Sequence, residues 1–319
     1  MKYIEEINKI RTEINGVLIG KEDKVELVLN AFLSGGHVLL EDVPGVGKTT
    51  LANALARSLD VSFGRIQFTP DTLPSDVTGV SVYNMKTGSF EYVKGAIMHN
   101  IILADEINRT SPKTQASLLE AMEEKQVTVD GAIYPLEEPF MVIATQNPVD
   151  FLGTYNLPEA QLDRFLMRIS LGYPNMNQEI KMAENYLNHR SLQCIEAVCS
   201  KAMVKEMKKE VEKVFVDADI ISFAVEITEA TRSNESLSLG ASPRATLALI
   251  RSAQSRAYLM ERDYVIPDDV LKMLEPVLCH RMVLSMEAKL ARQSAEEVIQ
   301  QILRKIKVPI LKNISVENK

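Results

Sequence analysis

The 319-residue sequence has no tryptophan and few cysteines, histidines or aromatic residues. The three cysteines, Cys194, Cys199 and Cys279, lack Cys-x-x-Cys spacing, and the four histidines are scattered, so neither a disulfide framework nor a zinc site is indicated. Glycine and proline, at 14 and 13 residues, are too sparse for a fibrous or disordered chain. The composition is that of an ordinary globular protein, with a length that suggests about two domains.

Long apolar runs and an excess of basic residues are also missing. No stretch approaches the roughly 18 consecutive apolar residues of a membrane-spanning helix, and the acidic segment Met1–Glu6 does not resemble the start of a signal peptide. The formal net charge of -7 argues against a broad basic surface for nucleic acid, although a local basic channel is compatible with it. We therefore predict a cytoplasmic protein without a membrane span, for which nucleic acid is not the expected partner.

The hydrophobic pattern changes near Tyr173-Pro174, which predicts one domain over residues 1–173 and another over 174–319. In the first domain, short apolar runs alternate with helical segments, a pattern typical of a covered, mostly parallel sheet in the α/β class. Strands are expected at residues 38–41, 65–68, 101–104, 140–145 and 168–171, and helices at 24–33, 49–59 and 112–123, the last capped by Ser111. From Asn177 onward the periodicity predicts an all-helical domain of five or six helices, including 219–231, 243–261 and 267–279.

Two pairs of short β-rich segments interrupt the alternation of strands and helices. Residues 80–83 and 90–93 flank a Gly-containing turn, and residues 127–129 and 132–134 flank Asp130-Gly131, a two-residue turn signal. Both pairs are predicted to be β-hairpins inserted into the plan of the sheet.

The strongest motif is a buried strand, a Gly-rich loop and the start of a helix at residues 38–50. Gly45 and Gly47 would let backbone N–H groups surround phosphate oxygens, Lys48 would reach the β- and γ-phosphates of ATP, and Thr49 would offer a hydroxyl to Mg²⁺. Asp42 departs from the pattern, since it occupies the first glycine position. The alternative is a Gly-rich turn with an incidental lysine.

Polar residues also end two further predicted strands. Asp105 would meet the Mg²⁺ held by Thr49, and Glu106 could polarise a water for attack on the γ-phosphate. Asn147 could orient that water or touch the phosphate. Taken alone, the two acids would suggest a solvated turn, and Asn147 could equally form an Asx turn before Pro148.

These motifs resemble those of the MoxR family of AAA+ ATPases, over about residues 17–282. The blocks that carry the resemblance are Leu40-Glu-Asp-Val-Pro-Gly-Val-Gly-Lys-Thr49, Asp105-Glu-Ile-Asn-Arg109, Pro112-Lys-Thr-Gln115, Leu119-Glu-Ala-Met122, Ala144-Thr-Gln-Asn-Pro148, Leu157-Pro-Glu-Ala-Gln-Leu-Asp-Arg-Phe165 and Gly240-Ala-Ser-Pro-Arg244. An acidic residue at position 42 is usual in that family. The resemblance implies nucleotide contacts by Gly45, Val46, Gly47, Lys48, Thr49 and Thr50.

The resemblance also implies roles that the residues alone do not give. Asn147 would be sensor 1, Arg164 the arginine finger presented to a neighbouring subunit, and Arg244 the sensor 2 arginine of the helical lid. Arg168 is a second candidate for the finger, unless it lies in the last strand, and Ile19 is a candidate adenine contact. The competing interpretations are a salt bridge of Arg164 to Asp163 or Glu159, a solvated first-turn residue for Arg244, and an ordinary core isoleucine for Ile19.

At the level of the whole protein, the resemblance implies an ATP-hydrolysing ring, expected to be a hexamer. It implies a chaperone-like remodelling or maturation factor that acts on protein clients beside a partner with a von Willebrand factor A domain. The two hairpins resemble the helix 2 insert and the pre-sensor 1 hairpin, although surface decoration is an alternative. A nucleic-acid motor, a metal-chelatase motor subunit and a non-hydrolysing nucleotide-binding scaffold are the rival functions.

Overall fold

The computed structural model describes residues 2–147, 154–187 and 192–310, so Pro148 of the predicted Asx turn lies outside the described residues. The chain forms two compact units, one made of Tyr3–Lys208 and the other chiefly of the chain after Lys208. The division falls within helix α8, Lys201–Glu212. Each unit is described by itself below.

The first unit is built on a five-stranded sheet with the order β2-β5-β8-β1-β9. All four pairings are parallel, as the unbroken apolar runs predict. The strands are β1 Val38–Glu41, β2 Phe63–Gln67, β5 Ile101–Asp105, β8 Met141–Gln146 and β9 Met167–Ile169. In the register, Gln67 lies beside Asp105, and Glu41 lies beside Gln146. The polar residues at the carboxyl ends of four strands therefore share one edge.

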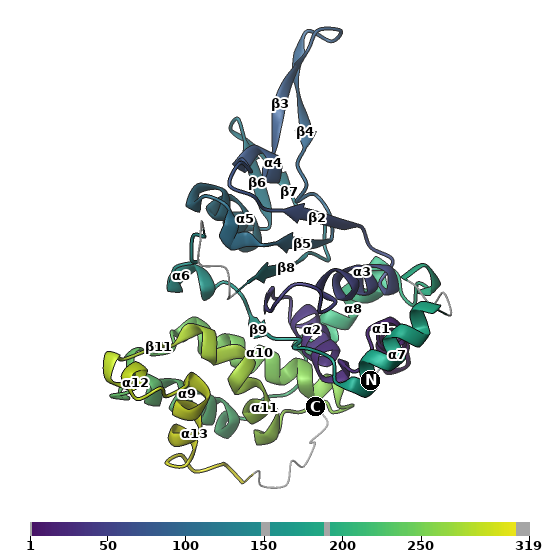
Figure 1. Ribbon diagram of the computed structural model, residues 1–319. Coiled ribbons are helices and arrows are strands. Elements are labelled where there is room, and N and C mark those ends of the chain that lie inside the picture. The colour runs from purple at the N-terminus through teal and green to yellow at the C-terminus, as the bar shows by residue number, and fades with distance from the viewer. Residues whose placement is uncertain (1, 148–153, 188–191, 311–319) are drawn as a thin grey trace. The chain divides into compact units, whose positions relative to one another are not determined.

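Helices cover both faces of this sheet (Figure 1), which explains why the central strands are buried. Helix α5, Pro112–Glu124, places Leu118, Leu119 and Met122 in one core cluster with Ile102 and Val142. Helix α3, Lys48–Ser58, packs against β2 and β5, and α1, Ile4–Val17, packs against α3 and α2, Glu22–Leu33. Ser111 caps α5 by accepting the Thr114 N–H, as predicted.

Both predicted hairpins are present in the first unit. Strands β3, Gly79–Asn84, and β4, Ser89–Lys94, form a long antiparallel ribbon that extends away from the sheet (Figure 1). Strands β6, Gln126–Val129, and β7, Ala132–Pro135, are joined through Asp130 and Gly131, both with positive φ, as a two-residue hairpin turn requires. Short helices occupy connections elsewhere in the unit: α4 Pro74–Thr78, η1 Ile107–Arg109, α6 Glu159–Leu162 and η2 Leu192–Cys194.

The sheet ends close to the predicted boundary at residue 173, but the compact unit continues to Lys208. Hydrogen bonds explain the difference. Gln178 of α7, Met176–Leu187, donates to the Gly20 carbonyl oxygen. Further along the chain, the Val198 N–H donates to the Ser58 carbonyl oxygen at 2.9 Å, and Lys201 Nζ donates to Glu137 at 2.7 Å. The change in hydrophobic pattern at 173 therefore coincides with the end of the sheet, whereas hydrogen bonds tie α7 and the start of α8 to the same unit.

The second unit is mainly helical, as predicted. Its helices are α9 Ala218–Arg232, α10 Pro243–Leu259, α11 Pro267–Leu278, η3 Cys279–Arg281, α12 Met286–Leu290 and α13 Ala295–Leu303. Pro243 and Pro267 occupy first-turn positions, and Ser242 caps α10. Helix α10 packs on α9 and α11, and α13 packs on α9.

Two details of the predicted helical domain were wrong. Seven α-helices, α7 to α13, follow residue 173 in the described part of the chain, where five or six were expected. A small antiparallel pair, β10 Leu237–Leu239 and β11 Val283–Leu284, also lies among the helices of the second unit. Strands of two or three residues are too short to show a periodicity. No helix within the described ranges is long and apolar enough to cross a membrane.

Candidate functional site

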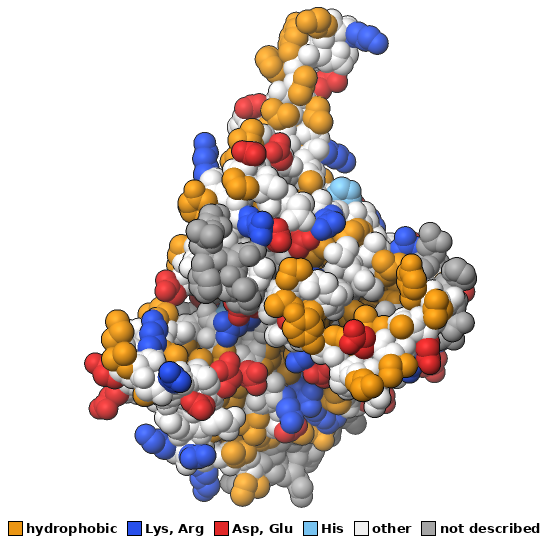
Figure 2. Space-filling model, in the orientation of Figure 1, with side chains coloured by type: hydrophobic (Ala, Val, Ile, Leu, Met, Phe, Trp, Pro, Cys, Tyr) orange, Lys and Arg blue, Asp and Glu red, His pale blue; other side chains and the backbone are white. Residues whose placement is uncertain are grey.

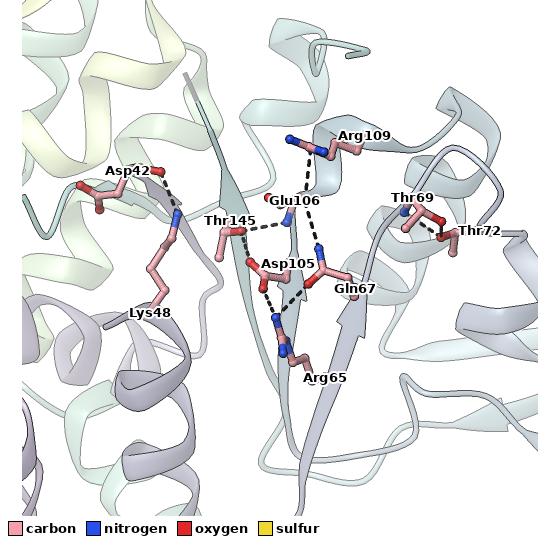
Figure 3. A network of polar contacts seen from close by, with 10 residues as sticks. All are labelled: Asp42, Lys48, Arg65, Gln67, Thr69, Thr72, Asp105, Glu106, Arg109 and Thr145. Carbon is pink, nitrogen blue, oxygen red and sulfur yellow. Dashed lines mark hydrogen bonds and ion pairs between the residues drawn. The ribbon is translucent and has the colours of Figure 1, made fainter. Parts of the chain in front are cut away.

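A pocket of about 420 Å³ lies at the carboxyl ends of the parallel strands in the first unit. This is the edge where open α/β sheets bind ligands. Figure 3 shows several of its side chains, which come from β2, the end of β5 and the start of α3. The lining residues are Pro44, Gly45, Gly47, Lys48, Thr49, Thr50, Arg65, Gln67, Asp105, Glu106 and Asn147.

The Gly-rich loop takes a conformation that needs its glycines. Gly45 and Gly47 have φ of +86° and +99°, in the region that L side chains rarely adopt. Gly47 directly precedes α3, so the helix N-terminus, with its unpaired N–H groups, faces the pocket. Lys48 Nζ donates to the Asp42 carbonyl oxygen at 2.8 Å. Desolvation lowers the pKa of Lys48, while the charges of Asp42, Asp105 and Glu106 oppose that shift.

Asp42 explains why this loop departs from the usual glycine pattern. Its side chain is buried and accepts hydrogen bonds from Ser170, from the Leu171 N–H at 2.6 Å and from the Gly172 N–H at 2.9 Å. Glycine could make none of these contacts. The Asp42 carboxylate therefore hydrogen-bonds the first residue of the phosphate loop to the segment after β9. The backbone carbonyl oxygen of Asp42 positions Lys48.

Asp105 ends β5 with both carboxylate oxygens engaged. Thr145 of β8 donates its hydroxyl to Oδ1 at 2.6 Å, and Arg65 of β2 donates to Oδ2 at 2.6 Å (Figure 3). The same Thr145 hydroxyl accepts the Glu106 N–H at 2.8 Å. One threonine thus positions both members of the acidic pair.

Glu106 has a left-handed backbone, with φ of +57° and ψ of +48°, which is uncommon for a residue other than glycine. Its side chain accepts a hydrogen bond from Gln67 Nε2 at 3.0 Å and forms an ion pair with Arg109 at 3.2 Å. The carboxylate therefore lines the pocket without projecting freely into it (Figure 3).

The donor set of the pocket fits Mg²⁺. Thr49 and Asp105, the predicted ligands, both line it and offer a hydroxyl and a carboxylate, the hard oxygen atoms that Mg²⁺ prefers. Among the residues that the structure describes, no three His, Cys, Asp or Glu side chains form a metal cage. A site with few protein ligands is typical of Mg²⁺ that arrives with a nucleotide's phosphates.

Other predicted nucleotide contacts divide into two groups. Asn147 and Thr50 line the pocket, whereas the Val46 side chain is buried and lies outside the lining. Ile19 is half-buried and is not a lining residue either. Its neighbour Leu18 is closer to the phosphate loop, because a Cβ added at Gly47 would lie 2.9 Å from Leu18 Cδ1.

The predicted arginines lie outside this pocket. Arg164 forms an ion pair with Glu123 of α5 at 3.1 Å, and not the salt bridge to Asp163 or Glu159 that the sequence suggested. Arg168 lies in β9, the alternative raised for it, and its guanidinium is 3.3 Å from Glu41. Arg244 is exposed in the first turn of α10, in the second unit.

Sequence reasoning missed four residues that organise the pocket: Arg65, Gln67, Arg109 and Thr145. A signal for two of them was present. Arg65 and Gln67 are two positions apart in a predicted strand, so they share one face and point in the same direction. Their proximity to Asp105 depends on the β2-β5 pairing, which the sequence did not reveal.

Comparison with known proteins identifies the family. Residues 37–167 match the ATPase family associated with various cellular activities (AAA), and residues 229–302 match the AAA lid domain. The chain is 39% identical to Chaperone MoxR1 of Mycobacterium tuberculosis over 306 residues, which is 93% of this chain and 81% of that one. It belongs to the MoxR family of AAA+ ATPases. The resemblance inferred from the motifs is thereby confirmed.

Two further relatives match the MoxR-family chain over nearly its full length. The uncharacterized protein YeaC of Bacillus subtilis is 51% identical over 314 residues, covering 97% of this chain and 98% of YeaC. A crystal structure of a candidate ATPase from Cytophaga hutchinsonii has a TM-score of 0.90 at 40% identity, covering 97% of this chain and 96% of that one. The arrangement of an AAA domain followed by a helical lid is therefore shared with a solved relative.

Proposed function

We propose that this MoxR-family protein binds Mg²⁺ and ATP in the pocket at the strand ends and hydrolyses ATP there. The observation that carries the proposal is that one pocket of about 420 Å³ gathers Lys48, Thr49, Asp105, Glu106 and Asn147 from separate segments of the chain. Chance placement would not collect a phosphate-binding loop, a metal-ligand set and a candidate base at one sheet edge.

Each residue has a distinct part in the proposed reaction. Backbone N–H groups of the loop and the Lys48 ammonium bind the phosphates, which are the strongest negative charges of the ligand. Mg²⁺, when bound, neutralises charge on the β- and γ-phosphates, and Thr49 and Asp105 would hold it. Glu106 accepts a proton from the attacking water, and Asn147 orients that water through its neutral amide.

We further propose that hydrolysis is coupled to a ring of identical subunits, expected to be a hexamer, that remodels or matures protein clients in the cytoplasm. A relative that is named a chaperone supports this role. In the ring, Arg164 would act on the neighbour's ATP and Arg244 would sense the γ-phosphate from the lid, whose boundary we place near residue 173. Ile19 is proposed as an adenine contact, and a von Willebrand factor A domain protein as a partner.

Two substitutions test the ATP site. Lys48→Ala removes the charge that matches the phosphates, so we expect ATP affinity to fall by at least about tenfold, since hydrogen bonds to charged groups contribute roughly 1.5–3 kcal/mol. Glu106→Gln keeps the size of the side chain and loses the basic oxygen, so it should bind ATP normally and hydrolyse it at least about 100-fold more slowly. Calorimetric titration and phosphate release measure the two effects.

The control for both is Lys86→Ala, which removes a lysine from the exposed turn between β3 and β4. This variant should bind and hydrolyse ATP like the unmodified protein. Unchanged ATP affinity in Lys48→Ala would contradict the phosphate-loop assignment, and normal turnover in Glu106→Gln would place the base elsewhere.

A further inference from the structure

Strand β2 contributes a cation to the pocket that belongs to none of the motifs above. Arg65 Nη2 donates to Asp105 Oδ2 at 2.6 Å and to Gln67 Oε1 at 2.8 Å. The Gln67 amide in turn donates to Glu106. Arg65 is therefore the cation that directly contacts the predicted metal ligand (Figure 3).

The two partners of this ion pair differ in how firmly they are held. The Asp105 side chain is 14% exposed and is fixed from the other side by Thr145. The Arg65 side chain is 48% exposed, and it lies on a strand at the end of the sheet order. Arg65 is therefore the more accessible partner of the pair, and Asp105 is the more firmly held.

We propose that Arg65 weakens the binding of the divalent cation to the protein–nucleotide complex by placing a positive charge on the same carboxylate that the cation needs. This inference rests on the proposed binding of Mg²⁺ and nucleotide in this pocket. Like charges a few ångströms apart repel, and the repulsion is strongest where side chains are partly screened from water. The pocket thus holds its cation less tightly than Thr49 and Asp105 alone would allow.

Weak binding of the divalent cation would help the proposed ATPase to release its product. If Asp105 had no cationic partner, it would bind the divalent cation more tightly. The product nucleotide would then also be released more slowly, because the cation and the nucleotide share one site and stabilise each other. Arg65 lets Asp105 exchange the cation for a guanidinium when the product leaves. It acts through Asp105, so it is a positioning residue and not a catalytic one.

Direct measurement of cation binding tests the proposal without relying on activity. Protein in excess over the non-hydrolysable analogue AMPPNP is titrated with Mn²⁺, and free Mn²⁺ is followed by its electron paramagnetic resonance signal. The variants are Arg65→Gln, which removes the charge, and Arg65→Lys, which keeps it. Arg11→Gln is the matched control, since it breaks the Arg11–Glu26 ion pair in the same unit, away from the pocket.

We expect Arg65→Gln to bind Mn²⁺ more tightly by on the order of tenfold, which is the size of effect that one nearby charge produces in a partly exposed site. Arg65→Lys and Arg11→Gln should stay within about twofold of the unmodified protein. Thermal unfolding of each variant verifies that the fold is retained.

Two results for the variants would overturn the inference. Equal or weaker Mn²⁺ binding in Arg65→Gln would show that the charge does not oppose the cation. Equal tightening by Arg65→Lys and Arg65→Gln would show an effect of shape. If the first result is accompanied by a loss of AMPPNP affinity, Arg65 is a phosphate contact. If the unmodified protein binds no AMPPNP, the proposed function fails, and this inference fails with it.

Discussion

The His37 side chain, from the residue before β1, links β8 to α5. Its Nδ1 accepts the Val142 N–H of β8 at 3.0 Å, and its Nε2 lies 3.1 Å from the Met122 carbonyl oxygen of α5. An Nδ1 that accepts leaves Nε2–H as the donor, so the ring is neutral. Burial lowers the pKa of His37 to about 4. The hydrogen bond to the Met122 carbonyl opposes this shift, and the positive charges of Lys208 and Lys125 add to it.

The lowered pKa of His37 predicts that the free energy of unfolding decreases in acid. The pKa of His37 is about 4 in the folded state and near 6.5 when unfolded, so protons bind preferentially to the unfolded chain between these values. The stabilisation is complete above pH 6.5 and declines as the pH falls. At pH 5 the loss from this group should be about 2 kcal/mol. Urea unfolding at pH 7.5 and pH 5 measures it.

The matched variant for this measurement is His37→Gln, whose amide can accept one hydrogen bond and donate another without titrating. Between pH 7.5 and pH 5, the free energy of unfolding of His37→Gln should fall by about 2 kcal/mol less than that of the unmodified protein. Identical pH dependence in the two proteins would show that protonation of His37 is not linked to unfolding.

At the scale of single residues, the sequence predicted those parts of the pocket that lie within local motifs. Lys48 and Thr49 are adjacent to the glycines, and Asp105 and Glu106 end an apolar run. Arg65 belongs to no local motif, because its partner Asp105 is 40 positions away in the sequence and lies beside it only through the pairing of β2 with β5. The partner of Arg164 was missed for the same reason, since Glu123 belongs to a different helix.

Among the elements of the first unit, the β3–β4 hairpin carries a group of large apolar side chains that stay exposed. Met85 and Phe90 are 91% and 73% exposed, and Val82, Tyr83 and Val93 are about half exposed. Figure 2 shows hydrophobic side chains along this projection. Apolar residues clustered in this way on a projecting ribbon make the hairpin a candidate surface for the proposed protein client.

We expect Met85→Ser combined with Phe90→Ser to reduce binding of a permanently unfolded polypeptide by at least about tenfold, because burial of two large side chains is worth several kcal/mol. Stability should fall by about 0.5–1.5 kcal/mol, since both residues are exposed in the folded protein and Phe90→Ser removes the edge-on contact between the Phe90 and Tyr83 rings. Fluorescence anisotropy with labelled, reduced and carboxymethylated α-lactalbumin measures binding in the Glu106→Gln background with ATP.

The control is Leu290→Ser, which removes a side chain that is 78% exposed in α12 of the other unit. It should leave polypeptide binding unchanged. An equal loss in both variants, or no loss in the hairpin variant, would argue against the hairpin as a client-binding surface.

The prediction of elements from sequence succeeded where a pattern was long enough to repeat. The five parallel strands, both hairpins and the capped helix α5 were predicted close to their observed bounds. The pair β10–β11 was not, because its strands have three and two residues and pair across more than 40 positions. The extension of the first unit to Lys208 depends on tertiary hydrogen bonds such as that from the Val198 N–H to the Ser58 carbonyl oxygen.

At the scale of the whole molecule, Arg164 tests whether hydrolysis is completed between subunits. An arginine supplied to a phosphoryl-transfer site contributes on the order of 10³ to 10⁵ in rate. Arg164→Ala should therefore bind ATP normally and hydrolyse it at least about 100-fold more slowly, and the specific activity of the unmodified protein should rise with concentration as rings form. Phosphate release over a dilution series measures both.

The ion pair with Glu123 supplies the control. If Arg164 acts only by holding α5 within its own chain, Glu123→Gln should be as slow as Arg164→Ala. If Arg164 acts in a neighbour's site, Glu123→Gln should keep most of the activity, and mixing Arg164→Ala with Glu106→Gln should restore part of it. No recovery in mixtures that demonstrably exchange subunits would exclude the shared site.

The attachment of Asp42 also has a consequence for the order in which the protein acquires its pocket. The hydrogen bonds from Ser170, Leu171 and Gly172 to Asp42 span 128 to 130 positions, so a very long loop must close before they form. During synthesis, which proceeds from the N-terminus, the ribosome must deliver β9 and the residues after it before the Gly-rich loop has its native support. A nascent chain that ends before residue 170 carries the complete phosphate-binding motif in its sequence without the contacts that hold the first residue of that motif in place.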